Sequence, residues 1–193
     1  MKKQIIIASN NKGKIKEAQE ILKDYEIISM SDAGINIDVE EDQDTFEGNA
    51  KKKAETIAKK LEGRMCLADD SGIEIEYLDG FPGVRTKRWF EGTDRERNEA
   101  LIEKLNGVPH EKRKIKFITA LTLADCKKTN TVIGSMEGYV AECPRGENGF
   151  GFDEIFELEN GKTLAELSSE EKNEISSRRK ALEALREYME TIK

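Results

Sequence analysis

Two adjacent carboxylates, Asp69 and Asp70, are the residues of this sequence best suited to chemistry. They follow a short apolar run, Met65 to Ala68, that predicts a strand, and Ser71 and Gly72 come directly after them. Ligands in α/β sheets lie outside the ends of such strands, and a carboxylate there suits Mg²⁺, which prefers oxygen ligands. Because successive side chains of an extended segment point to opposite faces, we expect one aspartate to face a site and the other to fix the turn. The alternative is an ordinary Asp-Ser-Gly turn between two strands.

A polar turn followed by lysines is a second candidate for chemistry. An apolar strand is predicted over residues 4–8, Ser9-Asn10-Asn11 follow it, and apolar residues at helical spacing predict a helix that begins near Lys12. A helix N-terminus attracts anions, whereas lysine in the first turn is unfavourable for the helix itself. Lys12 and Lys14 therefore indicate a bound anion, with an ordinary capped helix as the alternative. The stretch is not a Walker A loop, because Ile15 stands where that loop needs Ser or Thr.

Composition excludes several classes of protein. The chain has 193 residues, which we interpret as a single domain spanning residues 1–193. Its net charge is −7, whereas a general nucleic-acid binder is normally basic, so no nucleic-acid partner is expected. The sequence has no signal peptide and no apolar run of membrane-span length, so we expect a cytoplasmic protein without a membrane partner.

Cysteine and histidine are too few for most metal or triad chemistry. The three cysteines form no CxxC pair, which favours free or buried thiols in a reducing compartment over a disulfide or zinc framework. The single histidine, His110, lies in a charged stretch typical of an exposed loop. Acid–base or metal chemistry must therefore use carboxylates and lysines.

The order of the predicted elements indicates an α/β protein with a mixed sheet. Residues 36–44 are an acidic loop, and Thr45 then opens an amphipathic helix. Asp125 to Lys128 join two long strands as an antiparallel hairpin, so the sheet is not purely parallel. The predicted strands are residues 4–8, 25–30, 65–68, 73–77, 115–124 and 129–141.

Two segments near the C-terminus add candidate ligand contacts. Residues 144–153 are rich in glycine and carry two phenylalanines, which lets backbone approach a ligand closely, with a flexible surface loop as the alternative. Ser168 and Glu171 are predicted to cap the last helix, whose inward stripe runs as far as Ile192. Arg178 falls on that stripe and must meet a partner, because an unpaired buried arginine is costly.

Taken together, these segments resemble the inosine triphosphate pyrophosphatase family over almost the whole chain. Each motif is weak alone, but their order and spacing together are specific. The motifs are Ser9-Asn10-Asn11-Lys12-Gly13-Lys14 with Glu17, Thr45-Phe46 with Asn49-Ala50 and Lys53-Ala54, Ala68-Asp69-Asp70-Ser71-Gly72, Gly80-Phe81-Pro82-Gly83-Val84, Arg88, Gly149-Phe150-Gly151-Phe152-Asp153, and Glu171-Lys172 with Ile175-Ser176 and Arg178.

The resemblance implies an α/β fold with a long mixed sheet and flanking helices, in which two lobes enclose a central nucleotide cleft. It also implies a homodimer that hydrolyses non-standard purine nucleoside triphosphates (ITP, dITP and XTP) to monophosphate and pyrophosphate with Mg²⁺, as a house-cleaning enzyme of the nucleotide pool.

The resemblance also implies roles for individual residues. Asp70 stands where the catalytic proton acceptor is expected, and Glu40 and Asp70 stand where the metal carboxylates are expected. The expected substrate contacts are Ser9, Asn10, Asn11, Lys12, Gly13, Lys14, Lys53, Ser71, Phe150, Gly151, Phe152, Asp153, Lys172, Ser177 and Arg178.

The sequence departs from the family pattern at three positions. Gly48 stands where Glu is frequent, Glu154 where Pro is usual, and Ser177 where a Ser-His-Arg motif has its histidine. A serine reaches less far than a histidine, and its hydroxyl both donates and accepts. We therefore expect ITP and XTP to be preferred over ATP, but by a smaller margin than the Ser-His-Arg pattern would give.

Two alternatives remain open at this point. The first is a Maf-like nucleotide pyrophosphatase, which the residues 9–14 also resemble, although the Gly-Phe-Gly-Phe-Asp motif argues against it. The second is a nucleotide-binding module that has lost turnover, suggested by Gly48 and Ser177.

Overall fold

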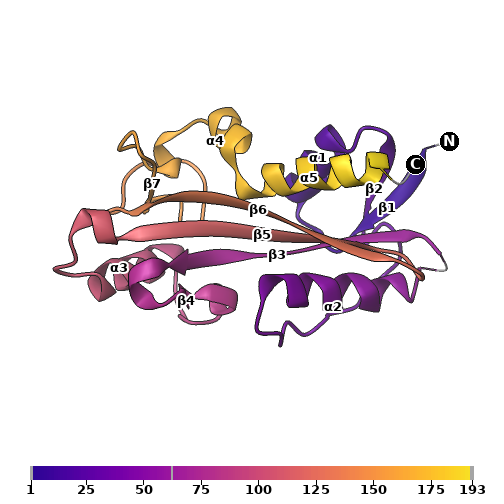
Figure 1. Ribbon diagram of the computed structural model, residues 1–193, viewed down its shortest axis with the longest axis horizontal. Coiled ribbons are helices and arrows are strands. Elements are labelled where there is room, and N and C mark those ends of the chain that lie inside the picture. The colour runs from indigo at the N-terminus through magenta and orange to yellow at the C-terminus, as the bar shows by residue number, and fades with distance from the viewer. Residues whose placement is uncertain (1, 62, 192–193) are drawn as a thin grey trace. The chain divides into compact units, whose positions relative to one another are not determined.

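The structure is a computed structural model that describes residues 2–61 and 63–191 (Figure 1). Seven strands form one sheet in the order β2-β1-β3-β5-β6-β7, with β4 paired to β3. The strands are β1 (Lys3–Ile7), β2 (Tyr25–Ser29), β3 (Met65–Ile75), β4 (Phe81–Pro82), β5 (Lys114–Ala124), β6 (Thr129–Val140) and β7 (Phe156–Glu157). The helices are α1 (Lys12–Ile21), α2 (Phe46–Ala58), α3 (Asp94–Lys104), α4 (Ser169–Ile175) and α5 (Ser177–Thr191). The predicted mixed α/β class is confirmed.

The chain forms two compact units, each built from separate stretches of sequence. The first unit comprises residues 1–71, 119–134 and 177–193, and the second comprises residues 72–118 and 135–176. Because the boundaries fall inside β3, β5 and β6, all three long strands contribute residues to both units. The predictions of a single domain and of a cleft between two lobes stay predictions.

The first unit places helices on both faces of its part of the sheet. Strand β1 pairs in parallel with β2 and with β3. Alternate residues point to opposite faces: Ile5 and Leu67 belong to a core shared with α1 and α5, whereas Ile6 and Cys66 belong to a core shared with α2. The same alternation, continued along β3, sends the two aspartates that follow to opposite faces.

The second unit has a core of its own. Ile73 and Ile75 of β3, Leu101 and Leu105 at the end of α3, and Phe156 of β7 are completely buried in it. The predicted capping box at the start of α3 is present, since Thr93 and Glu96 cap each other's backbone N–H groups.

Helix α2 begins as predicted. Thr45 is its N-cap and accepts a hydrogen bond from the N–H of Gly48, so the missing glutamate costs one half of a capping box and not the cap itself.

Two predictions of element boundaries are wrong. The strand of Asp69 does not end there: β3 runs without a break from Met65 to Ile75, and Tyr77 falls in a short 3₁₀ turn after it. Burial of the aspartates inside a strand is possible because other side chains neutralise or hydrogen-bond both carboxylates.

The last helix is divided in two. The capping box of Ser168 and Glu171 exists, but it caps α4, which ends at Ile175. Ser176 has an extended backbone, and α5 begins at Ser177, because serine competes with helix hydrogen bonds and favours helix ends. The predicted position of Ile192 lies outside the described residues.

Helix α5 lies directly against strand β6 at Gly134. A side-chain carbon added to Gly134 would lie 2.0 Å from the carbonyl oxygen of Ser177 and 2.5 Å from the backbone nitrogen of Ala181. Both contacts are with backbone, which cannot rotate away. The absence of a side chain at Gly134 therefore sets how closely the first turn of α5 packs on the sheet.

We predict that Gly134→Ala lowers the free energy of unfolding by about 2–3 kcal/mol, because the new methyl group overpacks the contact with α5. The measurement is urea unfolding followed by circular dichroism. Ile133→Ala is the matched control: Ile133 is 50% exposed on the same strand, and its loss is expected to cost less than about 1 kcal/mol. Equal effects of the two substitutions would contradict the close-packing argument.

Candidate active site

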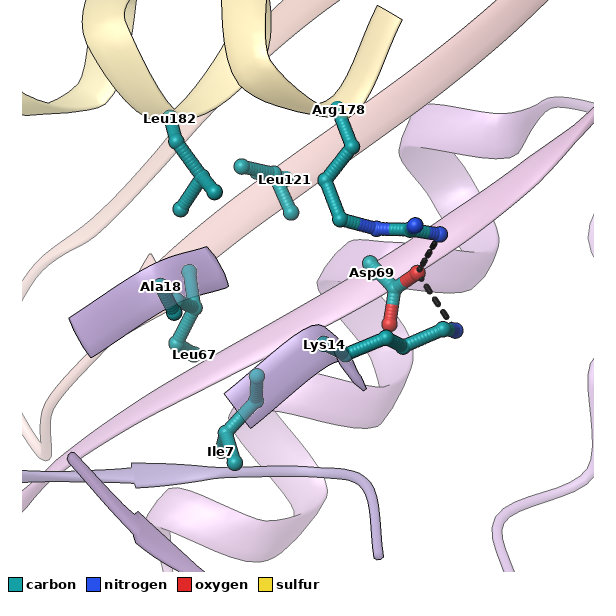
Figure 2. Close-up of a pocket in the computed structure, with 8 residues that line it drawn as sticks. All are labelled: Ile7, Lys14, Ala18, Leu67, Asp69, Leu121, Arg178 and Leu182. Atoms are coloured by element: carbon teal, nitrogen blue, oxygen red, sulfur yellow. Dashed lines mark hydrogen bonds and ion pairs between the residues drawn. The ribbon is translucent and has the colours of Figure 1, made fainter. Parts of the chain in front are cut away.

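A buried carboxylate held by two cations lies at the centre of the first unit. Asp69 is only 7% exposed, and its Oδ2 accepts hydrogen bonds from Lys14 Nζ at 2.8 Å and from an Arg178 guanidinium nitrogen at 3.4 Å (Figure 2). Arg178 also lies 3.7 Å from a carboxylate oxygen of Glu17. The partner predicted for Arg178 is thus found in the protein itself.

The charges around Asp69 keep it ionised. Burial raises the pKa of the Asp69 carboxyl, but the nearby charges of Lys14 and Arg178 lower it by more, so that this pKa lies well below its usual range. Apolar side chains from β1, β3, β5, α1 and α5 lie on one side of the three charges in Figure 2 and lower the effective dielectric constant there.

Asp70 lies on the opposite face of β3 and has a different set of partners. It is 5% exposed; its Oδ2 accepts a hydrogen bond from Asn49 Nδ2 at 2.9 Å and its Oδ1 accepts one from the Ser71 N–H at 3.0 Å. These two hydrogen bonds fix the orientation of the carboxylate. The two aspartates are therefore not a side-by-side dyad, as the alternation along the strand predicts.

Side chains of α2 hold the acidic loop beside Asp70. Asn49 Oδ1 accepts a hydrogen bond from the Gln43 N–H at 2.9 Å, and Lys52 pairs with Asp42 at 2.7 Å. Lys53 pairs with Glu41, and its Nζ also donates to the carbonyl oxygen of Asp69 at 3.3 Å.

The predicted metal ligand Glu40 is exposed in the same loop. Over residues 2–61 and 63–191, no group of three or more His, Cys, Asp or Glu side chains is placed to hold a metal ion. The pairing of Glu40 with Asp70 around a metal stays a prediction.

The predicted phosphate-binding turn is exposed but internally hydrogen-bonded. Asn11 Oδ1 accepts from the N–H groups of Gly13 at 2.9 Å and Lys14 at 3.3 Å, and Ser9 Oγ accepts from the Asn11 N–H at 3.1 Å. Asn10 Oδ1 accepts from the Ser31 N–H at 3.2 Å. An anion at this helix start would compete with Asn11 for these N–H groups, so it would depend more on the exposed Lys12 and on Lys14.

Three hydroxyl groups form a chain that starts at Ser71, whose side chain points to the face of β3 opposite to that of Asp70. Ser71 Oγ donates to Thr119 Oγ1 at 3.1 Å, and Thr119 Oγ1 lies 2.8 Å from Ser177 Oγ. Ser177, predicted to contact the base, is only 4% exposed.

In the second unit, the glycine-rich loop is organised by Asp153. Its Oδ2 lies 2.5 Å from Lys172 Nζ and accepts a hydrogen bond from the Phe150 N–H at 2.8 Å. Lys172 Nζ is also 4.6 Å from the centre of the Phe150 ring, which is 73% exposed. The structure thus brings Phe150, Asp153 and Lys172 together. All three were predicted to contact the substrate.

Helix α3 fixes the same loop from its other side. Asp94 Oδ2 accepts from the Gly151 N–H, and Asn98 Nδ2 donates to the Gly151 carbonyl oxygen, both at 2.8 Å. Arg97 lies over the ring of Phe152, 5.0 Å from its centre.

Sequence reasoning missed several of these supporting residues. Asn98 carried a usable signal, because a fully buried amide on the apolar side of a helix must find a hydrogen-bond partner. Thr119 carried none, since it lies in the middle of an apolar strand.

A cavity of about 780 Å³ lies in the second unit, and none of the predicted site residues lines it. Its carboxylates outnumber its lysines, so a triphosphate would be repelled there. Its charged lining residues are Glu74, Glu76, Asp79, Lys114, Lys116, Glu137 and Glu159.

Residues 5–188 match the Ham1 family. The chain belongs to the Ham1 family. Among curated relatives, a protein named dITP/XTP pyrophosphatase from Thermoanaerobacter sp. (strain X514) is 44% identical over 191 residues, covering 96% of this chain and 96% of the relative. A protein of the same name from Bacillus subtilis (strain 168) is 44% identical over 194 residues, covering 97% and 98%.

A solved Ham1 structure agrees with this fold. The Staphylococcus aureus Ham1 protein has a TM-score of 0.91 and 38% sequence identity, and the match covers 99% of this chain and 100% of that one. The resemblance inferred from the motifs is confirmed, whereas the roles of individual residues in this Ham1 chain stay predictions.

We predict that Asp69→Asn lowers the free energy of unfolding at pH 7 by about 3 kcal/mol, because it leaves Lys14 and Arg178 without their buried counter-charge. A depressed pKa stabilises the fold above the unfolded pKa of about 3.9, and this contribution is lost as the pH falls further. The variant should therefore lose less stability than the wild type when the pH is lowered from 5 to 3. Urea unfolding at several pH values measures this.

Glu20→Gln removes an exposed carboxylate of α1 and should keep the wild-type pH dependence. If Asp69→Asn and the wild type lose stability in parallel below pH 5, Asp69 is not the ionised centre described above.

Proposed function

We propose that this chain hydrolyses non-standard purine nucleoside triphosphates, namely ITP, dITP and XTP, to the monophosphate and pyrophosphate. Full-length similarity to relatives named dITP/XTP pyrophosphatase supports the substrate class. The observation that carries the mechanism is Asp70, a buried carboxylate whose orientation is fixed by the Asn49 amide and the Ser71 N–H.

In this mechanism a water molecule attacks the α-phosphorus and gives a proton to Asp70. The bond between the α-phosphorus and its bridging oxygen breaks, and pyrophosphate leaves as one unit. Such transfer depends mainly on positioning and on charge stabilisation. Lys14, Lys53 and Lys172 supply positive charge, and each is aligned in this structure by a carboxylate: Asp69, Glu41 and Asp153, respectively.

The side chains present suit magnesium. Asp70 and the acidic loop offer only oxygen donors, and Mg²⁺ in phosphate sites typically uses one or two carboxylates together with water and substrate phosphates. Asp70 and Glu40 would hold the ion. The bound Mg²⁺ would neutralise the charge of the triphosphate.

The proposal has two further parts: a homodimer, which rests on the resemblance, and a cytoplasmic location, which rests on the sequence analysis. Over the part of the chain that the structure describes, no helix combines the length and the apolar character needed to cross a membrane.

Membership of the Ham1 family favours this function over a Maf-like pyrophosphatase. The second alternative, a binding module without turnover, is decided by assay.

The first functional prediction concerns the products. Incubation of ITP with the protein and Mg²⁺ should give IMP and pyrophosphate in equal amounts, because the α-phosphorus is attacked. ATP should be hydrolysed more slowly than ITP, dITP or XTP. Chromatography of the nucleotides, with a coupled assay for pyrophosphate, measures both. IDP and orthophosphate as products would contradict the proposal, and inactivity on every triphosphate would favour the binding module.

The second functional prediction concerns Asp70. Asp70→Asn should lower kcat for ITP by about 10²- to 10⁴-fold, because an amide cannot accept the proton of the attacking water. Chelation of Mg²⁺ should abolish turnover of the wild type. Glu20→Gln, an exposed carboxylate in the same unit, should leave kcat unchanged. An Asp70→Asn variant with wild-type kcat would remove Asp70 from its catalytic role.

A further inference from the structure

The hydroxyl chain that starts at Ser71 lies on the face of β3 opposite to Asp70, and the direction of its first hydrogen bond is defined. A hydroxyl has one proton to donate and two lone pairs to accept. Ser71 donates its proton to Thr119, and a second hydrogen bond of 2.8 Å, in which either hydroxyl can donate, joins Thr119 to Ser177. Thr119 is 1% exposed and Ser177 4% exposed, whereas Ser71 is only partly buried. The chain therefore leads from a partly buried residue into the core.

This direction decides what Ser71 offers to a ligand. With its proton committed to Thr119, Ser71 Oγ has only lone pairs to offer to a ligand. A phosphate oxygen is itself an acceptor and is repelled there, whereas an O–H group of water or of a sugar is accepted. The Ser71 N–H meanwhile orients Asp70 Oδ1, so the same residue supports the carboxylate and offers the acceptor.

Ser177 is poorly placed to read a base directly. It is the first residue of α5, its hydroxyl is engaged by Thr119, and its carbonyl oxygen is packed against Gly134. These contacts also fix the position of the next residue, Arg178, which reaches Asp69.

We propose that Ser177 is a positioning residue that acts through Thr119 on Ser71, and that Ser71 thereby offers a hydrogen-bond acceptor to an O–H donor of the reacting complex. The proposal rests on the proposed hydrolysis and differs from the sequence-based prediction that Ser177 selects the base. It assigns to Thr119, which has no accessible surface to offer a substrate, a part in turnover.

The test compares two replacements of Thr119. Thr119→Val keeps the shape and removes the hydroxyl, whereas Thr119→Ser keeps the hydroxyl. With saturating ITP, Thr119→Val should lower kcat about tenfold and Thr119→Ser by less than about twofold, as expected for one hydrogen bond. The matched control is Thr122→Val: Thr122 is fully buried in the same strand and its hydroxyl lies 2.8 Å from that of Thr131. It should leave kcat unchanged.

Two further variants separate positioning from mere structural support. Ser177→Ala should lower kcat about tenfold without changing the ratio of kcat/KM for ITP and ATP. In a Ser71→Ala background, Ser177→Ala should have no further effect on kcat, because the hydroxyl that the chain orients is then absent.

Comparison of ITP with dITP identifies the O–H donor. If these variants lose kcat equally on ITP and dITP, the donor is water or another group common to both. If the loss is confined to ITP, the donor is the 2′-hydroxyl.

The proposal is overturned if Thr119→Val is as active as Thr119→Ser. It is also overturned if Ser177→Ala changes the ITP/ATP ratio while leaving kcat for ITP intact, since Ser177 would then read the base. A wild type that releases no pyrophosphate from any triphosphate overturns the proposed function, and this proposal with it. An active wild type with a silent Thr119→Val overturns this proposal alone.

Discussion

The buried charge of Asp69 is the constraint on which the first unit depends. A carboxylate inside a sheet is tolerated only when cations compensate for its lost hydration. Lys14 comes from the start of α1 and Arg178 from the first turn of α5, so one carboxylate ties two helices to the middle of β3. The same two cations belong to the segments that the family resemblance assigns to the substrate. The three side chains that stabilise this core thus include two that are also predicted to contact the substrate.

On the opposite face of β3, the second buried carboxylate is compensated by uncharged partners. Asp70 is oriented by an amide of α2 and by the backbone of Ser71, and that amide in turn holds the acidic loop through Gln43. The two consecutive carboxylates are compensated by ions on one face of the strand and by hydrogen bonds on the other. The strand therefore needs no turn between them. That is why β3 continues where the Asp-Asp-Ser-Gly sequence suggested an end.

Much of this arrangement was predictable because local signals agreed. The strand–turn–helix at residues 4–22, the cap at Thr45, the capping box at Thr93 and the hairpin at Asp125 each follow from short-range chemistry. The need of Arg178 for a partner followed from its place on an apolar stripe. The partner itself, and the contacts of Thr119 and Asp94, join residues far apart in sequence, and no local pattern encodes them. The division between α4 and α5 was missed for a different reason: the apolar spacing continues across the extended residue Ser176.

The discontinuous make-up of the first unit has a consequence for synthesis on the ribosome. Its sheet is assembled from residues that leave the exit tunnel early, but its last segment begins only at residue 177. Until α5 emerges, Asp69 lacks the guanidinium of Arg178, and the apolar surface that packs against Leu182 and Leu185 stays uncovered. The nascent chain must therefore carry an incomplete core for most of its translation, and the unit closes only when the final helix docks.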